Sequence, residues 1–128
     1  MFSLLAENLN FGEGPRWHNN KLWFSDFYQH SVMTLDLSGK IEKIVEIPNQ
    51  PSGLGWLPNG DLLIGSMLDR KIMKYSNNEL SLHSDLSKLT PFRCNDMVVD
   101  KDGDAYVGNF GSLHHARDVK PTLSLIHI

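Results

Sequence analysis

The segment Gly53-Leu-Gly-Trp-Leu-Pro-Asn-Gly-Asp-Leu-Leu-Ile-Gly-Ser66 contains an apolar stretch, a turn dipeptide and a second apolar stretch. Its dipeptide, Asn59-Gly60, tolerates the positive φ angles that a tight hairpin turn requires. The same pattern occurs in residues 14–26 and 95–109, where the dipeptides are Asn19-Asn20 and Asp102-Gly103. Each of the three segments therefore predicts a β-hairpin closed by a two-residue turn.

These hairpins belong to a longer repeat. Leu22, Leu62 and Ala105 take equivalent places, so the units are offset by 40 and then 43 residues. No stretch shows the apolar stripe of a helix of three turns or more. Four short strands in each unit of about 40–45 residues predict an all-β protein, a β-propeller in which each unit is one blade. Two further strands are expected in each of the first two units, at residues 31–37 and 40–47 and at residues 71–75 and 79–83.

The 128 residues hold two such units and the first half of a third. Propellers close with about 4–8 blades, so we expect a fragment of about two and a half blades. Residues 1–112 are predicted to form the blades and residues 113–122 a truncated loop or strand. Residues 123–128 match a translated sequencing adaptor, and we expect them to be an artefact. The alternative is a genuine short protein with a small apolar tail.

Composition excludes several classes of protein. The formal charge is −3, which offers no electrostatic footprint for nucleic acid or for an anionic membrane. No apolar run reaches the ~20 residues of a membrane span, and the first residues lack the features of a signal peptide. The single cysteine, Cys94, excludes a disulfide framework and a multi-cysteine zinc site. We therefore expect a cytoplasmic protein.

Three side chains are candidates for a functional site. Glu13 lies between two glycines before a predicted inner strand, where its carboxylate can face a central channel and bind a hard cation such as Ca²⁺. The alternative is a solvated turn glutamate. Arg93 and Asn95 are two residues apart, so on a strand they share a face and can bind an oxygen-rich substrate. Alternatively, Asn95-Asp96 only turns the chain into the strand. Cys94, on the other face, is expected to pack rather than to react.

Other motifs predict no site. Residues 100–104 superficially resemble a calcium loop, but their glycine position is that of a hairpin turn. The adjacent histidines His114 and His115 diverge and do not favour a shared metal. No glycine-rich phosphate loop is present. The tryptophans, which are expected to pack between blades, are Trp17, Trp23 and Trp56.

Five motifs in order closely resemble the gluconolactonase / regucalcin (senescence marker protein) family. They extend over about residues 7–112, and they are Glu13-Gly-Pro-Arg-Trp17, Leu22-Trp-Phe-Ser-Asp26, Pro51-Ser-Gly-Leu-Gly55, Cys94-Asn-Asp-Met-Val-Val-Asp100 and Tyr106-Val-Gly-Asn-Phe-Gly111. The resemblance implies a six-bladed propeller with one divalent cation in its channel, usually calcium, with zinc, magnesium or manganese as alternatives. It also implies hydrolysis of sugar lactones or similar small lactones.

By this resemblance Glu13 matches the family's metal ligand, and Arg93 and Asn95 match its substrate-binding residues. The other metal ligands and the aspartate that transfers protons have no counterpart in this chain, so no catalytic residue is assigned within it. A glutamate that contacts substrate in the family falls near Leu113, where no carboxylate occurs. The expected function is therefore part of a metal-dependent lactonase. The alternative is a non-catalytic propeller that binds calcium or a partner.

Overall fold

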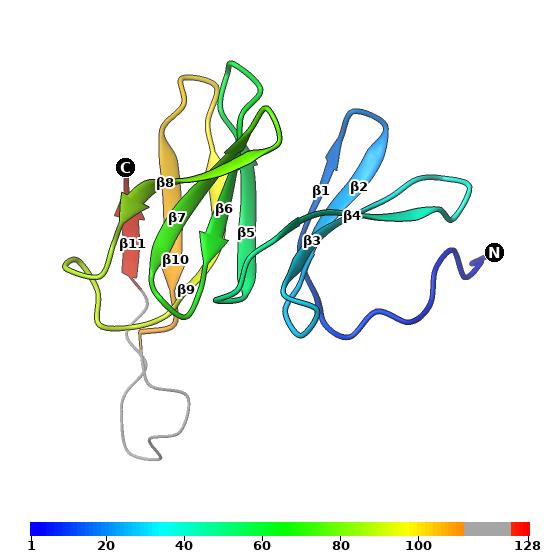
Figure 1. Cartoon of the computed structure of the whole chain (residues 1–128), viewed down its shortest axis with the longest axis horizontal. Helices are drawn as coiled ribbons and strands as arrows, with labels where there is room; N and C mark the ends of the chain where they lie inside the picture. The colour runs from blue at the N-terminus through cyan, green and yellow to red at the C-terminus, as the bar shows by residue number, and fades with distance from the viewer. Residues whose placement is uncertain (112–123) are drawn as a thin grey trace, which may run out of the picture.

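The computed structural model describes residues 1–111 and 124–128, with the side chain of Ser124 excepted. The described residues form strands and turns and contain no helix, as the sequence predicts. The strands make three antiparallel sheets (Figure 1). The first contains β1 (Gly12–His18), β2 (Lys21–Asp26), β3 (Ser31–Leu35) and β4 (Ile41–Glu46); the second contains β5 (Pro51–Trp56), β6 (Leu62–Ser66), β7 (Lys71–Ser76) and β8 (Glu79–Asp85); the third contains β9 (Cys94–Val99), β10 (Ala105–Asn109) and β11 (Ser124–His127).

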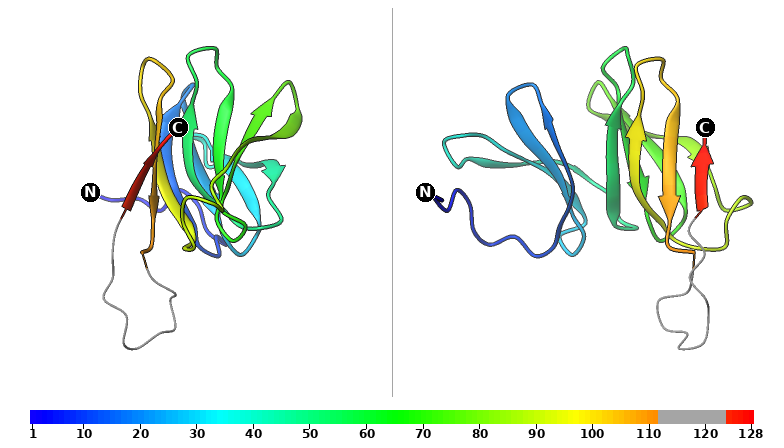
Figure 2. Two further views of the ribbon diagram at one scale, coloured as in Figure 1. Left: turned by 90° about the vertical axis from the view of Figure 1, so that its left-hand side faces the viewer. Right: turned by 180° about the vertical axis from the view of Figure 1, so that it is seen from behind.

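Each sheet is a meander, because every strand pairs with the one that follows it in the chain. The first strand of each sheet lies innermost: β5 packs against both β1 and β9. β1, β5 and β9 also run in the same direction (Figure 2). Residues at the start of these three strands therefore meet at one end of the molecule.

The pairing register confirms the sequence repeat. Leu22 pairs with Trp17, Leu62 with Trp56 and Ala105 with Val99. In each of the three hairpins this pair is the last or the second-last residue pair before the turn. The spacings of 40 and 43 residues thus correspond to structurally equivalent positions.

The turns are more varied than the sequence predicts. Asn19 and Asn20 do form a two-residue turn, since His18 pairs with Lys21 and both asparagines have positive φ. The prediction of two-residue turns in the second and third hairpins is wrong. There, the strands are joined by loops 57–61 and 100–104, in which Leu57 N–H donates to Asp61 O and Asp100 N–H to Asp104 O. Both loops still use a glycine of positive φ (Gly60 and Gly103).

The third sheet has a strand that the sequence analysis did not predict. β11 pairs with β10 from Tyr106↔His127 to Asn109↔Ser124. It comes from residues 123–128, the segment that we expected to be an adaptor artefact. The third sheet therefore has three strands, where we expected two. The predicted loop or strand at 113–122 lies outside the described residues, as do His114 and His115.

Apolar side chains fill the two spaces between neighbouring sheets. One cluster joins the first and second sheets and includes Val32, Leu54 and Ile64; the other joins the second and third and includes Leu63, Met97 and Val107. Trp23 and Trp56 pack against the first cluster, which confirms the prediction for these two residues. The prediction is wrong for Trp17, which is 57% exposed.

The innermost strands approach one another at glycines. A Cβ on Gly53 would collide with the backbone nitrogen of Met97, and one on Gly14 would lie 2.9 Å from Ser52 O. All three innermost strands also have a register shift near their start, between Glu13 and Arg16, between Pro51 and Leu54, and opposite Val107–Asn109. Bulges of this kind redirect side chains at the ends of sheets.

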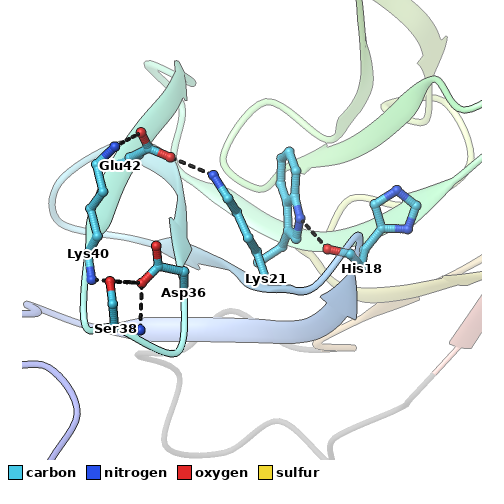
Figure 3. Close-up of polar contacts among 7 residues, drawn as sticks. His18, Lys21, Asp36, Ser38, Lys40 and Glu42 are labelled. Atoms are coloured by element: carbon cyan, nitrogen blue, oxygen red, sulfur yellow. Dashed lines mark hydrogen bonds and ion pairs between the residues drawn. The ribbon is translucent and has the colours of Figure 1, made fainter.

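The outer part of the first sheet carries exposed polar networks (Figure 3). Glu42 accepts hydrogen bonds from Lys21 Nζ at 2.6 Å and from Lys40 Nζ at 2.7 Å. These contacts lower the pKa of Glu42 to about 2. Asp36 Oδ1 accepts from the amide and hydroxyl of Ser38, which closes the β3–β4 turn. Within residues 1–111 and 124–128, no helix of the length and apolarity needed to cross a membrane is found.

Candidate functional site

A pocket of about 450 Å³ opens at the end where β1, β5 and β9 begin. Its volume lies within the range of small-molecule sites. All three sheets contribute to it, each through the start of its first strand or the end of its second. The lining residues are Phe11, Glu13, Phe27, Tyr28, Gln50, Met67, Arg93 and Phe110.

The pocket brings Glu13 and Arg93 together. Glu13 lies at the start of β1 and is half-buried, whereas Arg93 directly precedes β9 and is exposed. Gln50, which directly precedes β5, supplies the third polar side chain. A carboxylate, a guanidinium and an amide thus meet in one concave site, from three different sheets.

Asn95 takes a different position. It lies in β9 at the bulge, is half-buried, and is not among the lining residues. Its Oδ1 is buried and has no hydrogen-bond partner in the described part of the chain. An unsatisfied buried acceptor costs about 1–3 kcal/mol, so this atom is suited to accept from a ligand or water.

The rest of the lining is apolar and mostly aromatic, and the sequence analysis did not single it out. The rings of Phe11 and Phe27 stack with centroids 5.2 Å apart, and Tyr28 meets Phe11 edge-on at 5.8 Å. Met67 and Phe110 follow the ends of β6 and β10. The signal that was available is positional, because an apolar residue directly follows the second strand in all three units: Phe27, Met67 and Phe110.

Asp26 holds the aromatic residues of the first sheet in place. Its fully buried carboxylate accepts hydrogen bonds from the backbone amides of Asn10 and Phe11, and from the backbone and side chain of Gln29. Phe27 N–H donates in turn to Phe11 O. The two segments that carry the rings are therefore tied to one carboxylate.

Cys94 faces the core between the second and third sheets and is fully buried. Burial raises the pKa of its thiol to about 11. Because the thiolate is the nucleophilic form, this thiol is inert near neutral pH. The prediction that Cys94 packs rather than reacts is confirmed.

The oxygen atoms at the site are of the type that a hard cation prefers as ligands, but they are too few to hold one. Glu13 offers a carboxylate in the pocket and Asn95 an unpaired amide oxygen outside its lining, whereas calcium takes about 6–8 oxygen ligands. Residues 1–111 and 124–128 contain no group of three or more His, Cys, Asp or Glu side chains arranged to hold a metal. These residues alone do not make a complete metal site.

Antiparallel meanders packed through their innermost strands, with a pocket where those strands begin, are the architecture of a β-propeller. The sequence profile of the family described as SMP-30/Gluconolactonase/LRE-like region matches residues 11–127. The chain belongs to this family, as the five motifs indicate. A search of curated proteins found no significant match.

Solved structures share the fold. A gluconolactonase from Xanthomonas campestris superposes with a TM-score of 0.75 at 16% identity, over 97% of this chain and 46% of that one. A protein named as a calcium-binding regucalcin, from Agrobacterium tumefaciens, gives 0.71 at 16% identity, over 85% and 43%. A streptogramin B lyase gives 0.56 at 20% identity, over 84% and 37%. This chain spans less than half the length of each of these proteins.

Proposed function

We propose that this chain is part of a hydrolase of small lactones, in which the pocket at the start of β1, β5 and β9 binds the substrate. Membership of the family supports lactonase activity at the level of the family. The observation that carries the proposal is the meeting of Glu13 and Arg93 in one pocket. Glu13 lies in one of the five motifs, Arg93 directly precedes another, and by the resemblance both match functional positions of the family.

Arg93 is proposed to bind the substrate. Its guanidinium offers several N–H donors in a rigid fork, which suits the ring and carbonyl oxygens of a lactone. Asn95 Oδ1 lies nearby in sequence and is an acceptor without a partner in the described residues, so it can take a hydrogen bond from a substrate hydroxyl or a water. Arg93 would orient the ester group directly, whereas Asn95, which is not among the lining residues, would act through a bound water.

Glu13 is proposed to be one ligand of a divalent cation, most simply calcium. The name of the Agrobacterium tumefaciens protein supports this choice. The remaining ligands would come from outside the described residues. When bound, such a cation polarises a carbonyl or lowers the pKa of a water. The contribution of this chain is a carboxylate held at the start of β1 by the first sheet.

The 128-residue chain by itself is proposed to be inactive. Glu13 is the only carboxylate that lines the pocket among the described residues, so none remains there to move a proton once Glu13 binds metal. A longer protein with further blades would add ligands and a proton-transfer group.

A second candidate is a propeller that binds calcium or a partner without catalysis. It is favoured by the name of the regucalcin relative, which refers to calcium binding and not to a reaction. Hydrolysis by the longer protein distinguishes the two candidates, because only the first requires turnover.

The test is a kinetic comparison in the longer protein. Arg93→Met is expected to raise KM for lactones about tenfold or more, since one charged hydrogen bond contributes about 1.5–3 kcal/mol. Glu13→Gln is expected to lower kcat and to weaken calcium binding measured by calorimetry. Lys101→Met removes an exposed cation outside the pocket and serves as the control. Unchanged kinetics in Arg93→Met would contradict the proposed site.

A further inference from the structure

The pocket has more apolar than polar character. Five of its lining residues are apolar or aromatic, and only Glu13, Gln50 and Arg93 are charged or carry an amide. We infer that the lactone it accepts carries an aryl or alkyl substituent rather than the hydroxyl groups of a sugar. This inference rests on the proposed lactonase function and specifies its substrate class.

The hydroxyl groups of a sugar would find few hydrogen-bond partners in this pocket. A sugar lactone brings several hydroxyl groups into the site, and each that loses water without gaining a partner costs about 1–3 kcal/mol. If Glu13 binds a cation and Arg93 binds the ester, the amide of Gln50 and the hydroxyl of Tyr28 are the only polar side-chain groups left in the described lining. A polyhydroxylated ring would therefore be poorly satisfied here.

Three neighbouring aromatic side chains line part of the pocket. Phe11 stacks on Phe27 and meets Tyr28 edge-on, so the three rings form one continuous wall. Phe11 is 45% exposed and Tyr28 is 63% exposed, whereas Phe27 is buried beneath them. Large aromatic side chains left exposed in a concave site typically contact an apolar ligand.

Hydrogen bonds to Asp26 hold the segments that carry these aromatic residues. The buried Asp26 carboxylate binds the amides of Asn10 and Phe11 on one side and Gln29 on the other. The wall is thus fixed before any ligand arrives, which reduces the entropy cost of binding. A preformed aromatic wall discriminates by shape and apolar contact and offers few hydrogen bonds.

The experiment compares two probes, 3,4-dihydrocoumarin as an aryl lactone and galactono-1,4-lactone as a sugar lactone. Binding to the 128-residue chain is followed by NMR of the aromatic side chains, and hydrolysis is followed in the longer protein. We expect dihydrocoumarin to bind about tenfold more tightly and to have the higher kcat/KM. Tyr28→Ala is expected to weaken dihydrocoumarin binding about fivefold. The control Phe2→Ala removes an exposed ring outside the pocket and is expected to change nothing.

Equal binding of the two probes, or tighter binding of the sugar lactone, would overturn the inference. So would a Tyr28→Ala variant that binds dihydrocoumarin as the unmodified chain does. Hydrolysis that prefers the sugar lactone would overturn the inference and leave the proposed function standing. Hydrolysis of neither probe would overturn the inference, and the proposed function falls with it only when a panel of sugar, alkyl and aryl lactones is also not hydrolysed.

Discussion

Arg16 in β1 pairs with Asp96 in β9, with 2.7 Å between Nη2 and Oδ1. The same nitrogen donates to Met97 O at 2.6 Å, and Nη1 donates to Pro15 O at 2.9 Å. This one side chain therefore links the first sheet to the third, beside the strand starts that carry Glu13 and Arg93.

Arg16→Ala is expected to lower the free energy of unfolding by about 1 kcal/mol. The ion pair is partly exposed and contributes little, so most of this loss comes from the hydrogen bond to the buried Met97 backbone. Urea denaturation of the chain measures it. Lys101→Ala, which breaks an exposed pair with Asp102, is the control and is expected to change stability by less than about 0.5 kcal/mol. Equal effects of the two substitutions would contradict the linking role of Arg16.

Asp26→Ala is expected to destabilise the chain by about 3 kcal/mol or more. The substitution removes a buried carboxylate and leaves the amides of Asn10, Phe11 and Gln29 without their acceptor. Hydrogen exchange at the Asn10 and Phe11 amides should accelerate with the loss of stability. Asp102→Ala, at an exposed turn position, is the matched control. If Asp26→Ala leaves exchange at these two amides unchanged, Asp26 does not hold the aromatic wall.

Gly53→Ala is expected to cost about 2–3 kcal/mol, because the new Cβ meets the Met97 backbone and forces β5 away from β9. Gly12→Ala adds the same atom where its nearest contact, Phe24 Cδ2, is 3.9 Å away. The control is therefore expected to stay within about 0.5 kcal/mol of the unmodified chain. Thermal or urea unfolding of both variants measures the difference. A Gly53→Ala variant as stable as the unmodified chain would contradict the close approach of the innermost strands.

Acid should remove the contribution of Glu42. Lys21 and Lys40 lower its pKa in the folded chain to about 2, below the ordinary value of 4.5. The folded state therefore gains stability from Glu42 above pH 4.5, and loses it as the pH falls toward 2. A carboxyl NMR titration of Lys21→Met is expected to show this pKa moving back toward 4.5. Lys101→Met, outside this network, should leave it unchanged; an ordinary pKa in the unmodified chain would contradict the network in Figure 3.

The repeat was the part of the fold that the sequence could predict. Hairpins at equivalent spacing require residues that tolerate positive φ, and Asn19, Gly60 and Gly103 supply them. The length of the second and third loops was not predictable from the dipeptides, since hydrogen bonds across residues 57–61 and 100–104 set it. β11 was missed because its short segment has no strand pattern of its own and depends on the open edge of β10.

The site was predictable in part. Glu13, Arg93 and Asn95 were singled out from the sequence near the start of innermost strands; Glu13 and Arg93 line the pocket, whereas Asn95 does not. The aromatic wall was not predicted, because Phe11 reaches Phe27 and Tyr28 through tertiary contacts, which are its backbone hydrogen bonds to Asp26 and Phe27 and the ring stacking itself. Such contacts depend on three-dimensional packing, so they produce no regular residue spacing that could be recognised in the sequence.

The measurement that tests the central claim most directly is lactone hydrolysis by the longer protein and by the 128-residue chain, each with calcium and with a chelator. The account predicts turnover by the longer protein with calcium, its loss with chelator, and no turnover by the 128-residue chain. Comparable metal-dependent turnover by the 128-residue chain would contradict the claim that its residues form only part of the site. Absence of hydrolysis by the longer protein, over a panel of sugar, alkyl and aryl lactones, would contradict the proposed function.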